Sequence, residues 1–225
     1  MLDLLLPTRC VGCAAPGSLL CDACLVVTPA PRTPHPAPEG LPVCWSATLY
    51  EGAARQAVLH YKERGRTALA APLAQAVAFT IAMAVPEGGL AVVPVPSAGR
   101  AVRARGHDPV PRMAALAVRH LMRLGRQVTL RTDLRQSRRV ADQAGLSAAQ
   151  RAANLASSLQ VTQAGKAGLS GRSGPPVVIV DDVVTTGATL AEAARAVRET
   201  GVTVVAAVTF AATRRHARTA SDHGG

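Results

Sequence analysis

The segment of residues 177–189 constrains the fold of this 225-residue chain more than any other. Four apolar residues, Val-Val-Ile-Val, are followed by Asp181, Asp182, two valines and the turn sequence Thr-Thr-Gly-Ala-Thr. The apolar run predicts a strand buried on both faces, as in a parallel sheet. A helix is predicted over residues 190–200, so the turn joins a strand to a helix. In open α/β sheets, ligands bind at such carboxyl ends of strands.

The residue types in this segment point to a phosphorylated sugar. The turn offers backbone N–H groups and hydroxyls, and the start of a helix favours negative charge. Asp181 and Asp182 can accept hydrogen bonds from sugar hydroxyls or from metal-bound water. The alternative is a capped turn with two exposed aspartates, which does not explain why two like charges are adjacent where their repulsion calls for a cation. Thr189 and Glu192 have the spacing of a capping box, which predicts a capped helix start.

The rest of the chain alternates between strand-like and helix-like patterns. Strands are predicted over residues 43–50, 90–95, 128–130 and 202–210, and helices over residues 53–62, 72–84 and 112–124. Residues 162–174 are rich in Gly and Ser and predict a surface loop. Strands that alternate with helices favour an α/β fold with a mostly parallel central sheet flanked by helices.

Four of the five cysteines form two C-x-x-C pairs near the N-terminus. The pairs are Cys10 with Cys13 and Cys21 with Cys24, separated by seven residues. Such pairs can close a tetrahedral Zn–S4 shell, so we expect a compact structural zinc knuckle. Two disulfides are the alternative, but they are rare in a reducing compartment. Cys44 stands apart and is expected to be a small buried apolar residue.

Neither a signal peptide nor a membrane span is expected. Asp3 and Pro7 interrupt the apolar N-terminus, which favours a cytoplasmic protein. Residues 68–85 are uncharged, and their larger apolar side chains recur every four residues, which is typical of a buried helix.

The charge is strongly positive and unevenly distributed. The formal net charge is +11, and residues 95–155 hold 12 arginines against three aspartates. This block predicts an anionic partner such as phosphate, pyrophosphate or nucleic acid, although surface solvation explains some of these arginines. Aromatic residues make up 2% of the chain, which weighs against stacking platforms for single-stranded DNA.

The segment around Asp181 and Asp182 resembles the phosphoribosyl-pyrophosphate (PRPP) binding motif of type I phosphoribosyltransferases. The whole chain resembles the ComF family, which joins a cysteine module to a phosphoribosyltransferase domain. Further stretches that resemble the family are Tyr50-Glu-Gly52, His60-Tyr-Lys-Glu-Arg-Gly65, Val93-Pro-Val-Pro96 with the arginines that follow, and Gln143-Ala-Gly-Leu-Ser147 with Arg151 and Asn154-Leu155. One departure is His107-Asp108-Pro109, where the family has Phe-Asn-Gln. It puts a negative charge near the expected pyrophosphate site.

The resemblance implies a role for each matching residue. The 5′-phosphate would be held by Thr185, Thr186, Gly187, Ala188 and Thr189. Asp181 and Asp182 would bind the ribose hydroxyls, directly or through the hydration shell of Mg²⁺. Arg100 and Arg103 are candidates for the pyrophosphate. Residues 135–154 would close over the site, with Arg151 as the contact.

The resemblance also implies an organisation and a function. The zinc knuckle would span residues 1–28, a Pro-rich linker 29–42, the phosphoribosyltransferase-like domain 43–213 and a disordered tail 214–225. The implied activity is transfer of the phosphoribosyl group of PRPP to a nitrogen acceptor with Mg²⁺. A protein that binds PRPP or a nucleotide without turnover, and an accessory for DNA uptake that binds single-stranded DNA, remain as alternatives.

Overall fold

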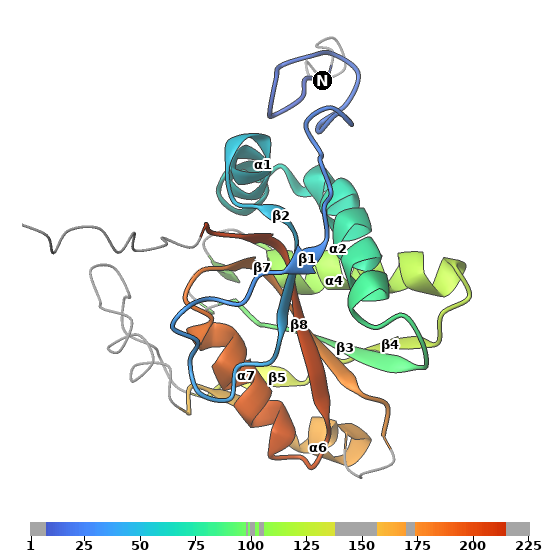
Figure 1. The fold of residues 1–225 in the computed structure, drawn as a ribbon, viewed down its shortest axis with the longest axis vertical. Coiled ribbons are helices and arrows are strands. Elements are labelled where there is room, and N and C mark those ends of the chain that lie inside the picture. Colours follow the sequence, from blue (N-terminus) through green and yellow to red (C-terminus); the bar gives the residue numbers. More distant parts are fainter. Residues whose placement is uncertain are drawn as a thin grey trace, which may run out of the picture.

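A six-stranded sheet forms the centre of the protein (Figure 1). The computed structural model describes residues 8–97, 99, 102–103, 106–137, 157–169 and 174–214. In spatial order, the strands are β1 (Ala30–Pro31), β2 (Cys44–Leu49), β8 (Val204–Ala212), β7 (Val177–Val184), β3 (Leu90–Pro94) and β4 (Val128–Leu130). All neighbouring pairs in this sheet are parallel except β1–β2. The predicted α/β fold with a mostly parallel sheet is confirmed.

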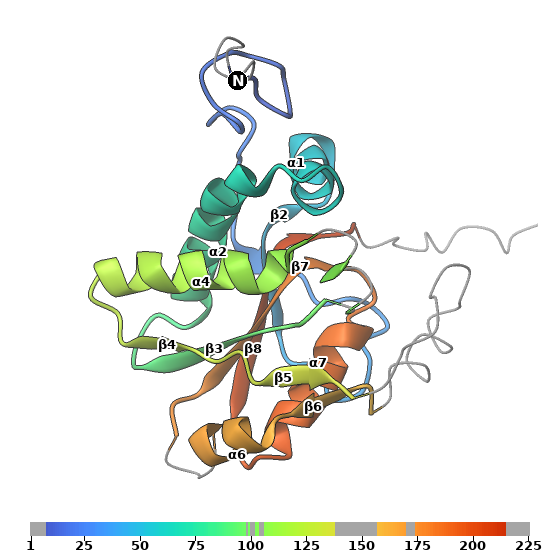
Figure 2. The ribbon, with the colours of Figure 1, turned by 180° about the vertical axis from the view of Figure 1, so that it is seen from behind.

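Helices cover both faces of the sheet (Figures 1 and 2). One face carries α1 (Gly52–Glu63), α2 (Ala70–Ala84) and α4 (Pro109–Arg123), and the other carries α7 (Ala188–Arg198). Side chains alternate along β7, so Val178 and Val180 pack into the first layer while Val177 and Ile179 pack under α7. Burial on both faces explains why this strand reads as an uninterrupted apolar run.

The uncharged helix α2 is part of the core. The stretch Thr67–Ala84, which includes a 3₁₀ turn over Thr67–Leu69, is long and apolar enough to cross a membrane by composition, but half of it is buried inside the protein. Its buried stripe includes Leu73, Val77 and Ile81. The stripe expected from the four-residue spacing therefore faces the protein interior.

Three short elements differ from the expectations. A second sheet pairs β5 (Leu134–Gln136) antiparallel with β6 (Leu159–Val161), and neither β5 nor β6 was predicted. The surface loop predicted over residues 162–174 is wrong in part, because α6 occupies Gln163–Leu169. Gly165 is buried there, and a Cβ on it would lie 2.3 Å from the Cβ of Asp133. This glycine permits close packing and does not mark a flexible loop.

The Pro-rich segment is extended, as predicted, but residues 30–33 are bound to the edge of the sheet. Within it, β1 pairs with β2, and the Arg32 N–H donates to the Cys44 carbonyl at 2.7 Å. The segment then reaches the turn before α7, where a Cβ on Gly187 would lie 2.8 Å from Cδ2 of Leu41. The Pro-rich segment therefore borders the turn that was predicted to bind phosphate.

Candidate functional site

The candidate site lies at the carboxyl ends of β3 and β7. Pro94 pairs with Val180, and the Val95 N–H donates to the Val180 carbonyl at 2.8 Å. Beyond these residues, the chain after β3 enters the loop that was expected to bind pyrophosphate, and β7 presents its two acids. Asp181 and Asp182 were expected after the end of the strand, but β7 continues through them to Val184. The acids are therefore held by the sheet and not by a loop.

Asp182 is buried and forms an ion pair with a lysine from α1. Its side chain is 8% exposed, and Oδ2 lies 2.6 Å from Nζ of Lys62. The other oxygen, Oδ1, accepts a hydrogen bond from the Val183 N–H at 2.7 Å. Asp181 is half-buried, and its Oδ1 accepts from the Asp182 N–H at 2.8 Å. Lys62 thus forms an ion pair with Asp182, and its charge also acts on Asp181.

The negative charge of Asp182 also affects the protonation of Asp181. Burial and the charge of Asp182 raise the pKa of Asp181 to about 8, while Lys62 acts in the opposite direction. A carboxyl group with this pKa is mostly protonated at pH 7. Perturbation of this kind, from burial together with a like charge, is typical of functional sites.

The turn after β7 leaves helix N–H groups available. Gly187 precedes α7 with a φ of +79°, a left-handed conformation that favours glycine. The Ala188 N–H approaches Thr186 Oγ1 at 3.4 Å, and the first helical bond runs from the Ala191 N–H to the Gly187 carbonyl. Within the described parts of the chain, the N–H groups of Thr189 and Leu190 have no backbone acceptor. Such groups at a helix start can bind the oxygens of a phosphate.

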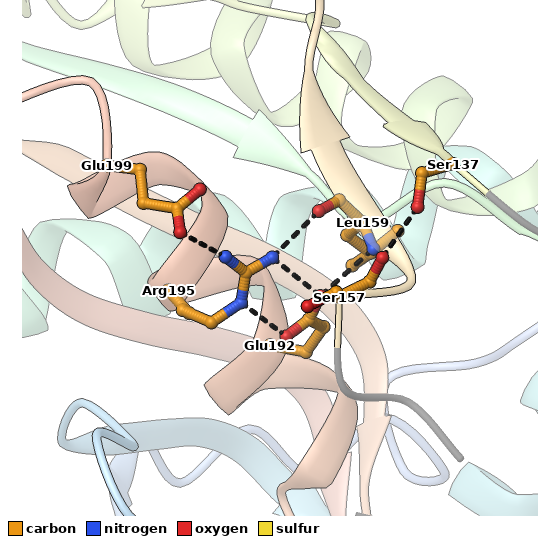
Figure 3. Close-up of polar contacts among 6 residues, drawn as sticks. All are labelled: Ser137, Ser157, Leu159, Glu192, Arg195 and Glu199. Atoms are coloured by element: carbon orange, nitrogen blue, oxygen red, sulfur yellow. Dashed lines mark hydrogen bonds and ion pairs between the residues drawn. The ribbon is translucent and has the colours of Figure 1, made fainter. Parts of the chain in front are cut away.

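The predicted capping box at the start of α7 is wrong. Glu192 is buried and does not cap the helix; its Oε1 accepts from the Leu159 N–H at 3.0 Å (Figure 3). Arg195 binds the same carboxylate at 2.7 Å and 2.9 Å and also donates to the Leu159 carbonyl at 3.0 Å. The helix that begins at the turn therefore holds strand β6.

Glu192 is ionised in this arrangement. Burial acts to raise its pKa, but the hydrogen bonds from Arg195 and from the Leu159 N–H outweigh burial and lower the pKa overall. At the end of the β5–β6 pair where segment 138–156 connects the two strands, Ser137 Oγ donates to the Ser157 carbonyl at 2.6 Å (Figure 3). These contacts fix the two residues between which the segment 138–156 leaves and rejoins the described chain.

The arginines predicted to contact pyrophosphate are only partly described. Arg103 is exposed in the loop after β3, and Arg100 lies outside the described residues, as does Arg151. At the base of this loop, Asp108 accepts hydrogen bonds from Ser97. The negative charge of Asp108, which departs from the family pattern, is thus used to hold the loop.

A comparison with protein-family models supports this interpretation of the fold. Residues 113–224 match the family model described as Phosphoribosyl transferase domain. The chain is therefore similar to this family over just under half of its length. The comparison with curated proteins gives no match.

The protein carries a cluster of four thiols near its N-terminus. The sulfur atoms of Cys10, Cys13, Cys21 and Cys24 all lie within 4.8 Å of one another, and none of these residues forms a disulfide. Sγ of Cys13 is 3.6 Å from Sγ of Cys21. Tetrahedral zinc with Zn–S bonds of about 2.3 Å separates its sulfur ligands by roughly 3.8 Å. The cluster can therefore bind zinc.

Backbone N–H groups stabilise the thiolate form of Cys10 in this cluster. Burial acts to raise the pKa of Cys10, but N–H groups of the surrounding turns, including those of Cys21 and Gly12, lower it to about 6. The cluster also packs on the main body of the protein, since a Cβ on Gly12 would lie 2.6 Å from the Cβ of Ala53 in α1. Cys10 and Leu20 belong to the same apolar cluster as α1 and α2.

Sequence reasoning gave no role to Lys62, although it noted the stretch around it. A usable signal was present, because Lys62 and Lys166 are the only lysines beside 23 arginines in the chain. Lysine and arginine are not interchangeable: lysine offers a compact point charge where arginine offers a planar fork. A rare lysine in an arginine-rich chain is therefore a candidate for a specific contact.

Proposed function

We propose that the protein binds PRPP together with Mg²⁺ and transfers the phosphoribosyl group to a nitrogen acceptor. The observation that carries this proposal is the position of two adjacent acids within β7, directly before a turn whose helix N–H groups are available. The acids can accept hydrogen bonds from ribose hydroxyls, and the N–H groups of the turn can donate to a phosphate. Both are present at the carboxyl edge of a parallel sheet, where this fold class binds ligands.

In the proposed complex, each group has one task. Thr185, Thr186, Gly187, Ala188 and Thr189 hold the 5′-phosphate with backbone N–H groups and hydroxyls. Asp181 and Asp182 bind the ribose hydroxyls and favour the positive charge that develops at the anomeric carbon. Arg100 and Arg103 bind the departing pyrophosphate, and Arg151 contacts the substrate from the segment 138–156.

The acid pair also fits Mg²⁺, which prefers oxygen ligands and keeps several waters when it binds phosphorylated substrates. Asp181 has one carboxylate oxygen that no described hydrogen bond uses, and Asp182 has one oxygen shared only with Lys62. Bound Mg²⁺ would offset the charge of the pyrophosphate. Zn²⁺ in the thiolate cluster would be structural, because four cysteines leave no coordination position open.

A second candidate function is nucleic-acid binding, as expected for a ComF-type accessory of DNA uptake. The specific observation in its favour is a row of exposed arginines on α4: Arg112, Arg119 and Arg123. No acidic residue interrupts this helix. Such a surface would bind DNA through its phosphates, with an affinity that falls steeply with salt.

Release of pyrophosphate from PRPP, measured with Mg²⁺ and a panel of bases and amines, tests transferase activity. We expect release with at least one acceptor, and none from the double variant Asp181→Asn/Asp182→Asn. Binding of PRPP without release in any arm would leave a binding protein of the same fold. Retention on single-stranded DNA at low salt, lost on replacing the three arginines of α4 with glutamine, would favour the second candidate.

A further inference from the structure

The ion pair between Lys62 and Asp182 occupies the atom that a ligand needs, an inference that rests on the function proposed above. Asp182 has two carboxylate oxygens. Oδ1 accepts the Val183 N–H, and among the described residues the buried Oδ2 has no contact beyond its ion pair with Lys62. A ribose hydroxyl or a hydrated cation that approaches Asp182 must therefore share or replace the ammonium group of Lys62.

Lys62 reaches this atom from a well-anchored helix end. The preceding residue, Tyr61, is 1% exposed, and its hydroxyl donates to the Pro109 carbonyl at 2.7 Å. This bond ties the last turn of α1 to the first turn of α4. The side chain of Lys62 itself is 29% exposed, so its ammonium group can leave Asp182 without unpacking the helix. The backbone is fixed while the charged end can move.

We propose that Lys62 is a specificity-determining residue that competes with divalent cations for Asp182 and yields only to a ligand that brings its own negative charge. A free cation would displace the ammonium of Lys62 from Asp182 and repel it, because both are positively charged. A cation bound to a pyrophosphorylated sugar supplies phosphate oxygens to which the displaced ammonium can bind. A neutral sugar would bring no negative charge to replace the interaction of Lys62 with the Asp182 carboxylate.

The competition has a direct consequence for cation binding in the absence of substrate. The parent protein should bind Mn²⁺ weakly, since Lys62 already offsets the charge of Asp182. Replacing Lys62 with methionine keeps the length of the side chain and removes the charge. Because unit charges about 4 Å apart interact by several kcal/mol near a protein surface, we expect Lys62→Met to bind Mn²⁺ at least tenfold more tightly.

The experiment measures free Mn²⁺ by electron paramagnetic resonance at pH 8.5, without PRPP. Lys62→Met and Lys62→Gln should both tighten Mn²⁺ binding; glutamine keeps a hydrogen-bond donor for Asp182 in case the methionine variant does not fold. Lys62→Arg, which keeps the charge, should bind Mn²⁺ as the parent does. The control Lys166→Met on α6 should also match the parent. The gain should vanish in Lys62→Met/Asp182→Asn.

Unchanged Mn²⁺ affinity in folded Lys62→Met and Lys62→Gln would overturn the inference. A second arm measures PRPP binding with Mg²⁺, where both neutral variants should bind more weakly than the parent while Lys62→Arg recovers most of the affinity. If the parent binds PRPP but Mn²⁺ affinity does not change, the proposed function stands and the role of Lys62 is wrong. If Mn²⁺ binding tightens but the parent does not bind PRPP, the competition stands and the substrate is wrong.

Discussion

The carboxylate of Asp108 holds Ser97 by two hydrogen bonds, one from the hydroxyl at 2.7 Å and one from the N–H at 3.1 Å. Ser97 follows β3, and Asp108 directly precedes α4. The two residues therefore close the base of the loop that carries Arg103. Asp108 was the residue whose charge departed most from the pyrophosphate-binding pattern, and its contacts give that charge a structural role.

Replacing Asp108 with alanine should destabilise the protein, because Ser97 loses both acceptors. Hydrogen bonds to a charged group contribute about 1.5–3 kcal/mol each when partly buried, so we expect a loss of about 2 kcal/mol or more in the free energy of unfolding. Urea denaturation measures this loss. The matched control is Asp108→Asn, which keeps one acceptor oxygen and should lose less. Equal stability of the alanine variant and the parent would refute this role.

Replacing Asp181 with asparagine should stabilise the protein at alkaline pH. The carboxyl group has a pKa of about 8 in the folded protein, above the value of 3.8 expected when unfolded. Because the folded state binds the proton more tightly, stability falls as pH rises from about 4 to 8. Asparagine has no charge to bury. The stability of the variant relative to the parent should therefore increase from about pH 4 to 8 and stay higher above pH 8.

Melting temperatures at pH 5, 6.5, 8 and 9 test the stabilisation by Asp181→Asn. At pH 9 we expect the variant to melt at least about 2 °C above the parent, which corresponds to roughly 1 kcal/mol in a chain of this size. Glu87→Gln, which changes an exposed acid in the turn between α2 and β3, is the control and should show no such trend. A variant that is less stable than the parent at every pH would contradict the account of Asp181.

Removal of zinc should lower the stability of the whole protein and not only of its N-terminus. The reason is that the cluster packs against α1 through Gly12 and Cys10. Elemental analysis should find about one zinc per chain in protein prepared without chelator. Chelation, or the variant Cys24→Ser, should lower the melting temperature. The control Cys44→Ala should retain zinc, since burial raises the pKa of Cys44 to about 12 and keeps it a thiol. Zinc-free protein with an unchanged melting curve would exclude the site.

Replacing Glu192 with glutamine should loosen the attachment of β6 to α7. The buried carboxylate binds Arg195 and the Leu159 N–H, so we expect a loss of about 2–3 kcal/mol at pH 7. Because the pKa of Glu192 is lowered in the folded state, this difference should shrink as pH falls below about 4.5. Glu199→Gln, at an exposed acid that contacts the same arginine, should cost less than about 0.5 kcal/mol.

The strongly patterned parts of the fold could be predicted from the sequence. The apolar run before Asp181 predicted β7, and the four-residue spacing of apolar side chains predicted the buried face of α2. These predictions succeed because burial on two faces, or on one stripe, leaves a periodic signal. The C-x-x-C pairs predicted a cluster of four thiols in the same way, since their spacing alone brings them together.

The remaining features depend on contacts that are distant in the sequence. Gly165 indicated a loop, but its missing side chain makes room for Asp133. Glu192 had the spacing of a cap, yet the half-exposed Arg195 and the backbone of β6 use its carboxylate. The contact between Lys62 and Asp182 joins residues 120 positions apart, and no local pattern encodes it. Short strands such as β5 and β6 carry too few residues for a periodic signal.

Calorimetric titration with PRPP and Mg²⁺ measures whether the acids of β7 and the turn before α7 bind this substrate. We expect saturable binding with one site per chain, much weaker binding of ribose 5-phosphate, and loss of binding in a folded Asp181→Asn/Asp182→Asn variant. No binding of PRPP by the parent protein, or equal binding of PRPP by the double variant, would contradict the proposed site.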